Sequence, residues 1–217
     1  SEVRFLSHLD LVRTMERAIR RAGLPMAYSE GFTPRPIMSY GYALPVGILS
    51  EAEYGDFTFA VDLDPEEFVR CYNQHLPKGL EVLWAERLPE KTPTLMGEIN
   101  AASWRLFLPQ TSGGPEQIKA RWEWLQGVDS FVVKRDTKKG REIDIRPFLF
   151  DVYEIAPSST GTVFDCLCGL GNEANLRMEE LGDLLGFDHL EATITRTGQF
   201  KKVGNHYFPP LGNRGCK

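Results

Sequence analysis

The sequence is short of cysteine, histidine and long apolar runs, and each shortage excludes a class of protein. Among its 217 residues are Cys 4 and His 4. Cysteines this few and this scattered do not make a disulfide scaffold, and they indicate a reducing, cytoplasmic compartment. The longest uncharged stretch, residues 36–50, contains proline and glycine and falls short of the about 18 apolar residues of a membrane helix. No membrane span is therefore expected.

Common enzyme and metal motifs are also absent. The sequence has no Gly-x-x-x-x-Gly-Lys-Ser/Thr phosphate loop, no Gly-x-Gly-x-x-Gly turn, no His-Glu-x-x-His pair and no Gly-x-Ser-x-Gly nucleophile turn. Cys166 and Cys168 are close enough to raise the alternative of a metal site. Strand alternation, however, places them on one apolar face with Phe164 and Leu170. We interpret them as buried core thiols and predict neither a metal nor a cofactor in this chain.

The composition that is present indicates a soluble, folded protein. Hydrophobic residues make up 42% and charged residues 25%, which argues against a disordered chain. The net charge of -5 argues against a partner held by bulk positive charge, so a nucleic acid is expected only at local basic patches. The chain starts with neither an initiator Met nor a signal-peptide pattern, and we expect it to be cut from a longer polypeptide.

The first half, residues 1–88, predicts the element order of a ferredoxin-like unit. Ser7 and Asp10 predict a capped helix that ends at Gly23. After a loop with two prolines, the pattern predicts strands at 37–44, 54–63 and 80–85 and a helix at 65–76. If residues 3–5 belong to a first strand, the order strand, helix, strand, strand, helix, strand is ferredoxin-like.

The second half, residues 101–197, repeats this pattern after a linker at residues 89–100. It predicts strands at 103–108, 130–134, 141–145, 148–155, 162–170 and 192–197, and helices at 115–126 and 177–185. Residues 198–217 are expected to form an extended tail. The predicted fold class is α+β, with two ferredoxin-like halves whose sheets are antiparallel and whose helices lie on one face.

Basic residues gather in two places. At about 100° per residue, the arginine side of the first helix lies opposite its apolar side. Residues 134–146 hold six basic and three acidic residues on a predicted hairpin. A solvated surface is the ordinary interpretation of both, but guanidinium groups also suit phosphate, and exposed rings suit unpaired bases. The RNA-binding candidates are Arg13, Arg17, Arg20, Arg21, Phe32, Arg35, Lys138, Lys139 and Arg141.

Candidates for catalysis are few. His8 precedes the arginine side and lies beside Asp10 at the start of the helix. A general base held by a carboxylate is one interpretation of this pair, and a helix cap with a surface histidine is the other. Glu30 is the only carboxylate in the loop at residues 30–36. The candidates for a catalytic role are therefore His8, Asp10 and Glu30.

Short motifs spread over most of the chain carry a family resemblance. Among them are His8-Leu9-Asp10-Leu11-Val12-Arg13, Ser29-Glu30-Gly31-Phe32-Thr33-Pro34, Leu44-Pro45-Val46-Gly47, Asp144-Ile145-Arg146-Pro147 and Thr195-Arg196-Thr197. Together they resemble the radical-SAM-linked protein family, a domain of unknown function fused to or encoded beside a radical SAM enzyme. The resemblance implies a radical SAM protein or domain as partner, with S-adenosylmethionine and an iron–sulfur cluster in that partner.

A looser likeness is carried by Asn73-Gln74-His75-Leu76-Pro77, Leu80-Glu81-Val82-Leu83 and Ala101-Ala102-Ser103-Trp104-Arg105. These segments resemble tRNA pseudouridine synthases of the TruA type, which implies a similar fold. The loop at residues 30–36 lacks the Asp that acts as nucleophile in that family. The chain alone is therefore expected to lack pseudouridine synthase activity.

Three hypotheses for function remain open at this point. We prefer a non-catalytic companion domain of a radical SAM enzyme that binds RNA or presents substrate to that enzyme. The second hypothesis is an RNA-modifying enzyme that uses His8, Asp10 and Arg35. The third is a structural domain that only docks the radical SAM partner.

Overall fold

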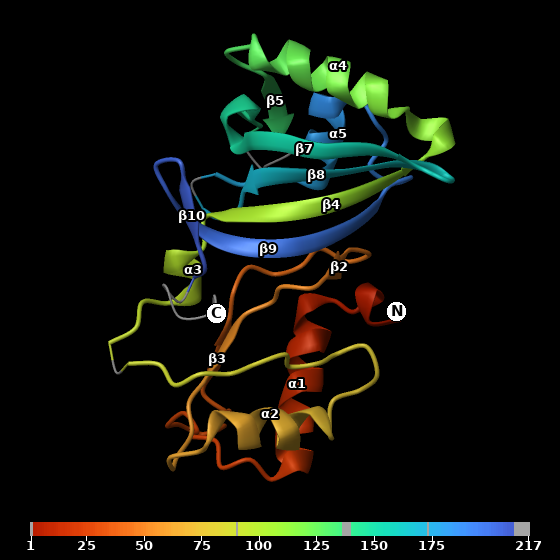
Figure 1. Ribbon diagram of the computed structural model, residues 1–217. Helices are drawn as coiled ribbons and strands as arrows, with labels where there is room; N and C mark the ends of the chain where they lie inside the picture. The colour runs from red at the N-terminus through yellow and green to blue at the C-terminus, as the bar shows by residue number, and fades with distance from the viewer. Residues whose placement is uncertain (1, 90, 136–139, 173, 211–217) are drawn as a thin grey trace. The chain divides into compact units, whose positions relative to one another are not determined.

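The computed structural model describes residues 2–89, 91–135, 140–172 and 174–210. The chain divides into two compact units, which are Ser1–Ile48 with Glu53–Gly97 (unit 1) and Leu49–Ala52 with Glu98–Lys217 (unit 2). Both contain helices and strands, which confirms the α+β class (Figure 1). Within the described ranges, no helix has the length and apolar character needed to cross a membrane.

Unit 1 is built on two helices and a small antiparallel sheet. Its elements are η1 (Glu2–Phe5), α1 (His8–Ala22), β1 (Met38–Tyr40), β3 (Gly55–Phe57) and α2 (Pro65–Asn73), and α3 (Leu95–Glu98) begins at its end. β1 pairs with β3, and an isolated bridge between Met26 and Phe59 extends the pairing. The strands predicted at 37–44 and 54–63 are therefore present in shorter form.

The ends of α1 lie where the sequence predicts them. The Ser7 hydroxyl accepts a hydrogen bond from the backbone N–H of Asp10 (3.2 Å) and donates one to its carboxylate (2.7 Å). Gly23 ends the helix with φ 62, a left-handed conformation that glycine adopts without the steric cost of a Cβ. At the start of α2, the Asp64 carboxylate accepts from the backbone N–H groups of Glu66 and Glu67. Local capping chemistry thus fixes both helices.

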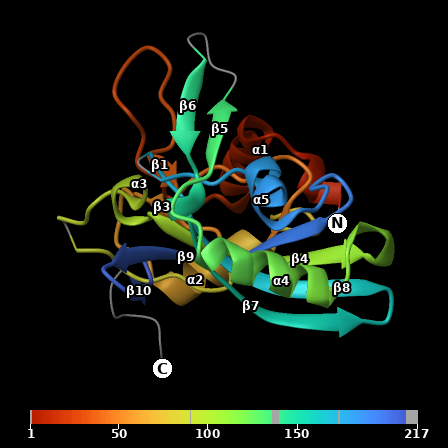
Figure 2. The ribbon, with the colours of Figure 1, turned by 90° about the horizontal axis from the view of Figure 1, so that it is seen from above.

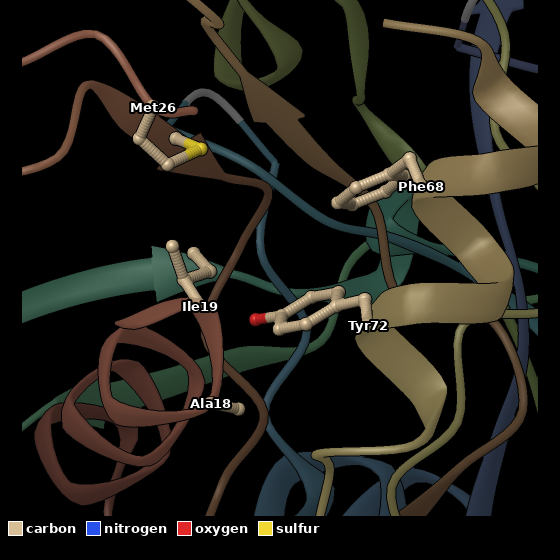
Figure 3. Close-up of a cluster of buried hydrophobic side chains, with 5 residues drawn as sticks. All are labelled: Ala18, Ile19, Met26, Phe68 and Tyr72. Carbon is tan, nitrogen blue, oxygen red and sulfur yellow. The ribbon is translucent and has the colours of Figure 1, made fainter. Parts of the chain in front are cut away.

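The core of unit 1 joins α1 to α2. Figure 3 shows the rings of Phe68 and Tyr72 extending from α2 toward Ala18 and Ile19 of α1, with Met26 beside them. The Tyr72 side chain is fully buried, and its hydroxyl donates to the backbone carbonyl of Met15 (3.1 Å). Burial of these side chains from water is the main stabilising contribution in this unit.

The ferredoxin-like order predicted for the first half is not present among the described residues of unit 1. Residues 3–5 lie in η1, a single 3-10 turn directly before the Ser7 cap, and are not a strand. Residues 80–85 form no strand either. The backbone of Val82 is held by the Asn73 amide, which donates to its carbonyl and accepts from its N–H (both 2.8 Å). Val82 and Ala85 of this segment pack on the core, whereas Leu83 and Trp84 are exposed.

Unit 2 is built on a mixed sheet. Its strands are β2 (Leu49–Ser50), β4 (Ala101–Pro109), β7 (Leu149–Ser158), β8 (Gly161–Gly169), β9 (Thr193–Val203) and β10 (His206–Phe208). They lie in the order β10-β9-β4-β8-β7, and β2 pairs with β9. All pairs are antiparallel except β2 with β9, which is parallel.

Two helices, α4 (Pro115–Gln126) and α5 (Met178–Leu185), lie on the same face of this sheet (Figures 1 and 2). β5 (Val132–Arg135) and β6 (Arg141–Asp144) form a separate hairpin, and the turns η2 (Gln110–Ser112) and η3 (Arg146–Phe148) complete the unit. Almost every element predicted for residues 101–197 is present within a few residues. The predicted linker contains α3, and the predicted tail begins inside β9 and continues into β10.

The Asp144-Ile145-Arg146-Pro147 motif has a structural role in unit 2. The Asp144 carboxylate accepts from the backbone N–H groups of Phe131 (2.8 Å) and Arg146 (3.1 Å). Burial by itself would raise the pKa of Asp144, but these hydrogen bonds outweigh it and hold the pKa below its usual value. The Arg146 guanidinium donates to the carbonyls of Leu125 (2.8 Å) and Leu149 (3.0 Å). The motif therefore ties the end of α4 to β6 and β7.

Candidate functional site

A hollow of about 430 Å³ lies within unit 1. It is lined by His8, Val12, Glu16, Arg35, Pro36, Met38, Ser39, Tyr40, Gly41, Ala43 and Met96. Its volume lies within the about 300 to 1,000 Å³ typical of small-molecule sites. An apolar floor with a few polar side chains is also the usual chemistry of such sites.

Three segments position the lining. His8, Val12 and Glu16 follow one another at four-residue spacing along α1, so they form one strip of the helix surface. The opposite wall comes from β1 and its flanking residues, 35–43. Met96 is held near this wall because the Tyr42 hydroxyl donates to its backbone carbonyl (3.0 Å).

Tyr40, the last residue of β1, lines the hollow. Its ring meets the His8 ring edge-on, with centroids 6.4 Å apart, and its hydroxyl donates to the Met38 sulfur (3.5 Å). A Cβ on Gly55 would lie 3.1 Å from this ring, so the glycine allows the close packing of β3 against β1. Burial, and secondarily the charge of Glu16, raises the pKa of Tyr40 far above its usual value. Tyr40 is therefore a neutral hydroxyl and an apolar surface at any physiological pH.

Glu16 and Arg35 give the hollow its charges. Glu16 is half-buried, and Arg35 is exposed. Within the described part of the chain, neither side chain has a hydrogen-bond or ion-pair partner. The backbone of Arg35 is nevertheless fixed, since its N–H donates to the Ser29 hydroxyl (3.1 Å) and its carbonyl accepts from the Ser29 N–H (2.9 Å). The site thus presents a carboxylate and a guanidinium whose hydrogen-bonding capacity is available to a ligand.

Ser39 lines the hollow and also contacts a titratable carboxylate, that of Asp56. Its hydroxyl donates to the Asp56 carboxylate (3.3 Å), and burial raises the pKa of Asp56 above its usual value of 3.8, an effect that the hydroxyl partly opposes. Because the folded chain holds this proton more tightly than the unfolded chain, ionised Asp56 destabilises the fold. This penalty sets in as the pH rises from 3.8 through the raised pKa, and it is absent at lower pH.

We therefore expect Asp56→Asn to raise the unfolding temperature at pH 7 and to leave it nearly unchanged below pH 3.8. Thermal unfolding across this pH range measures the effect. Ser39→Ala serves as the comparison, because loss of the hydroxyl should raise the pKa of Asp56 further and steepen the pH dependence. If the unfolding temperatures of Asp56→Asn and the parent depend on pH in the same way, Asp56 has the same pKa in the folded and the unfolded chain.

The arginine side of α1 is only partly available for a ligand. Arg17 and Arg20 are exposed and make no hydrogen bond or ion pair with any described residue. Arg13 has a long, exposed contact with Asp10 (3.7 Å). Arg21 is engaged differently, because its guanidinium donates to the backbone carbonyl of His75 just after α2 (2.6 Å). The structure thus gives Arg21 a packing role that its place on the helix did not suggest.

The second basic patch lies in unit 2, and the structure describes part of it. Lys138 and Lys139 fall outside the described residues, and Arg141 is exposed at the start of β6. Arg135, opposite Arg141 in the hairpin register, is largely buried and forms a two-fold hydrogen-bonded ion pair with Glu180 of α5 (2.6 and 2.7 Å). This pair anchors the base of the hairpin to α5.

The remaining candidate residues differ in whether they line the hollow. His8 and Arg35 both line the hollow, whereas Asp10 belongs to the helix cap and Glu30 lies exposed in the loop at 29–33. Phe32 is fully exposed (110%), which leaves its ring available for stacking. Glu16 and Met96 were not singled out in the sequence analysis. The four-residue spacing of His8, Val12 and Glu16 was the available signal.

The cysteines behave as core residues. Cys166 and Cys168 are fully buried on β8, as predicted, with their sulfurs 3.8 Å apart. Burial, and then the neighbouring Cys168, raises the pKa of Cys166 well above its usual value, so it remains a thiol. Among the described residues, no three His, Cys, Asp or Glu side chains gather as metal ligands do. The expectation that the chain binds no metal stays a prediction.

Comparison with protein-family models gives a match. A family model described as "Uncharacterized protein conserved in bacteria (DUF2344)" matches residues 1–178. The matched segment includes all of unit 1 and much of unit 2. The search of curated proteins gives no match.

Proposed function

The chain belongs to the DUF2344 family, and we propose that it is a non-catalytic companion domain of a radical SAM enzyme that binds RNA through unit 1. The observation that carries this proposal is the set of guanidinium groups at Arg17, Arg20 and Arg35, which are exposed and have no partner among the described residues. Arginine side chains in this state suit phosphate oxygens, to which they donate paired hydrogen bonds.

The overall charge does not prevent such binding. The net charge of -5 repels a polyanion at long range, but repulsion between charges farther apart than about 8 to 10 Å is screened at physiological salt. Direct contacts to phosphate are not screened in this way, and each releases a counterion. Phe32, fully exposed in the loop before Arg35, offers a ring on which an unpaired base can stack.

The resemblance to the radical-SAM-linked family supplies the proposed partner. It assigns S-adenosylmethionine and the iron–sulfur cluster to the partner module and not to this chain. The likeness to pseudouridine synthases is proposed at the level of fold, and unit 2 supports it. There β4, α4, β7, β8, α5 and β9 follow in ferredoxin-like order, and neighbouring strands β9-β4-β8-β7 pair antiparallel, with the β5–β6 hairpin inserted after α4.

A second candidate function is favoured by the hollow. His8 and Arg35 of the predicted enzyme site line it together with Glu16, so an acid–base pair next to a bound base is an alternative. Asp10, the other candidate for this enzyme, does not line the hollow, and its carboxylate accepts from the Ser7 hydroxyl in the helix cap. Turnover of an RNA base by the purified chain alone would favour this enzyme over the non-catalytic companion.

A salt titration tests the proposed function. We expect a labelled single-stranded RNA to bind the chain at low salt, and log K to fall by about 0.7 per phosphate contact for each unit of log salt. Fluorescence anisotropy at several salt concentrations gives this slope. If the RNA does not bind even at low salt while a radical SAM partner does, the chain is a docking domain.

A further inference from the structure

We infer that the hollow of unit 1 receives an unpaired guanine base of the bound RNA and that the Glu16 carboxylate recognises it. This inference rests on the proposed RNA-binding function and adds which base of the RNA the chain recognises. It follows from the combination of an apolar floor, one acceptor-only group and a cationic rim in the same site.

The floor suits the flat face of a heterocycle. Val12, Pro36, Met38, Ala43 and Met96 supply apolar surface, and the Tyr40 and His8 rings lie edge-to-face beside them. Unpaired bases are bound in proteins by stacking on such surfaces. The two thioethers add adaptable, polarisable contacts that favour an aromatic ligand.

Glu16 decides which base fits. It is half-buried in the wall of the hollow, and no described side chain or backbone group donates a hydrogen bond to it. The neighbouring Tyr40 hydroxyl is directed to the Met38 sulfur and does not serve Glu16. A carboxylate accepts hydrogen bonds and donates none, so a base edge that pairs with both of its oxygens must present two donors.

Guanine alone among the four RNA bases offers two adjacent donors, N1–H and the N2 amino group, on its Watson–Crick edge. Adenine and cytosine place one amino group beside a ring nitrogen that accepts, and uracil places its N–H between two carbonyl oxygens. A carboxylate facing these edges meets at least one lone pair, which repels it. The carboxylate therefore selects guanine.

The rim explains why the base should belong to a nucleic acid. Arg35 lines the hollow and its side chain has no partner among the described residues, and Arg20 follows Glu16 by one turn of α1 on the same side of the helix. Both cations belong to segments that also carry or face Glu16. The phosphates on either side of the bound base can therefore contact positive charge while the base itself contacts the Glu16 carboxylate. A free base carries no phosphate, so it would contact the carboxylate but leave the arginines without a partner from the ligand.

The test uses labelled oligouridine with one central guanosine, inosine, adenosine or cytidine, and the full chain. We expect the guanosine oligomer to bind roughly tenfold more tightly than oligouridine, as one two-fold hydrogen-bonded contact to a base edge provides. Inosine keeps N1–H and lacks the amino group, so it should fall between the two. This comparison changes only the ligand and does not depend on the folding of a variant.

Glu16→Gln should abolish the preference for guanosine and retain the binding of oligouridine. Glu81→Gln is the matched control, because Glu81 is an exposed carboxylate of unit 1 that does not line the hollow, and it should keep the preference. Equal binding of all oligomers, or a preference that survives Glu16→Gln, would overturn this inference and leave the proposed function standing. Absence of binding to every oligomer at low salt would overturn both.

Discussion

Glu180→Ala is expected to lower the free energy of unfolding of unit 2 by about 3 to 5 kcal/mol. The Glu180 and Arg135 side chains are 5% and 13% exposed, and their ends meet at 2.6 Å. Removal of the carboxylate leaves a guanidinium in a site from which water is largely excluded. It also removes the acceptor for the backbone N–H of Arg177 at the start of α5 (2.9 Å). The cost is therefore that of an uncompensated buried charge and a lost helix cap.

Tryptophan fluorescence during urea unfolding measures this effect, because Trp104, Trp122 and Trp124 all belong to unit 2. Glu179→Ala is the matched control: it is the same change one residue earlier, in a half-exposed contact with Arg177 (3.3 Å), and should cost at most about 1 kcal/mol. Equal losses for the two variants would show that the Arg135–Glu180 pair contributes no more than a surface contact.

This pair also shows the limit of reading the fold from the sequence. Capping residues and helix periodicity are local signals, and they predicted α1 from Ser7 to Gly23 and α4 at its observed bounds. Strand alternation likewise predicted that Cys166 and Cys168 are buried. The partnership of Arg135 with Glu180 joins residues 45 positions apart, and no periodicity encodes it.

The same reason explains the error in the first half. Residues 80–85 are mostly apolar, as a strand can be, but whether such a segment pairs depends on a free neighbouring edge, and Asn73 satisfies the backbone of Val82 instead. The hollow was missed because Glu16, Arg35 and Met96 come from separate parts of the sequence. The sequence grouped His8 and Arg35 with Asp10, whereas the structure places Asp10 in the helix cap and Glu16 in the lining of the hollow with His8 and Arg35.

The proposed RNA contact predicts a second large effect. Arg17→Glu combined with Arg20→Glu is expected to weaken RNA binding by at least about 100-fold at physiological salt, since each of the two lost hydrogen bonds to a charged group contributes about 1.5 to 3 kcal/mol. The slope of log K against log salt should also fall by about 0.7 for each lost phosphate contact on a single strand. Both side chains are exposed and make no hydrogen bond or ion pair with other described groups, so their replacement should leave the fold intact. The Arg20→Glu change places a negative charge near the C-terminal end of α1, which should cost about 0.3 to 1 kcal/mol of stability.

A double variant with the same change of charge separates contact from overall electrostatics. Arg70 and Lys78 are exposed residues of unit 1, away from α1 in the sequence and without an ion-pair partner among the described residues. Arg70→Glu with Lys78→Glu should weaken RNA binding only slightly, because screening removes most of the long-range effect at physiological salt. If the two double variants lose affinity equally, the effect is one of net charge and α1 makes no specific contact. If the α1 variant binds RNA as the parent does, its arginine side is a solvated surface, and phosphate contact must be sought elsewhere in the chain.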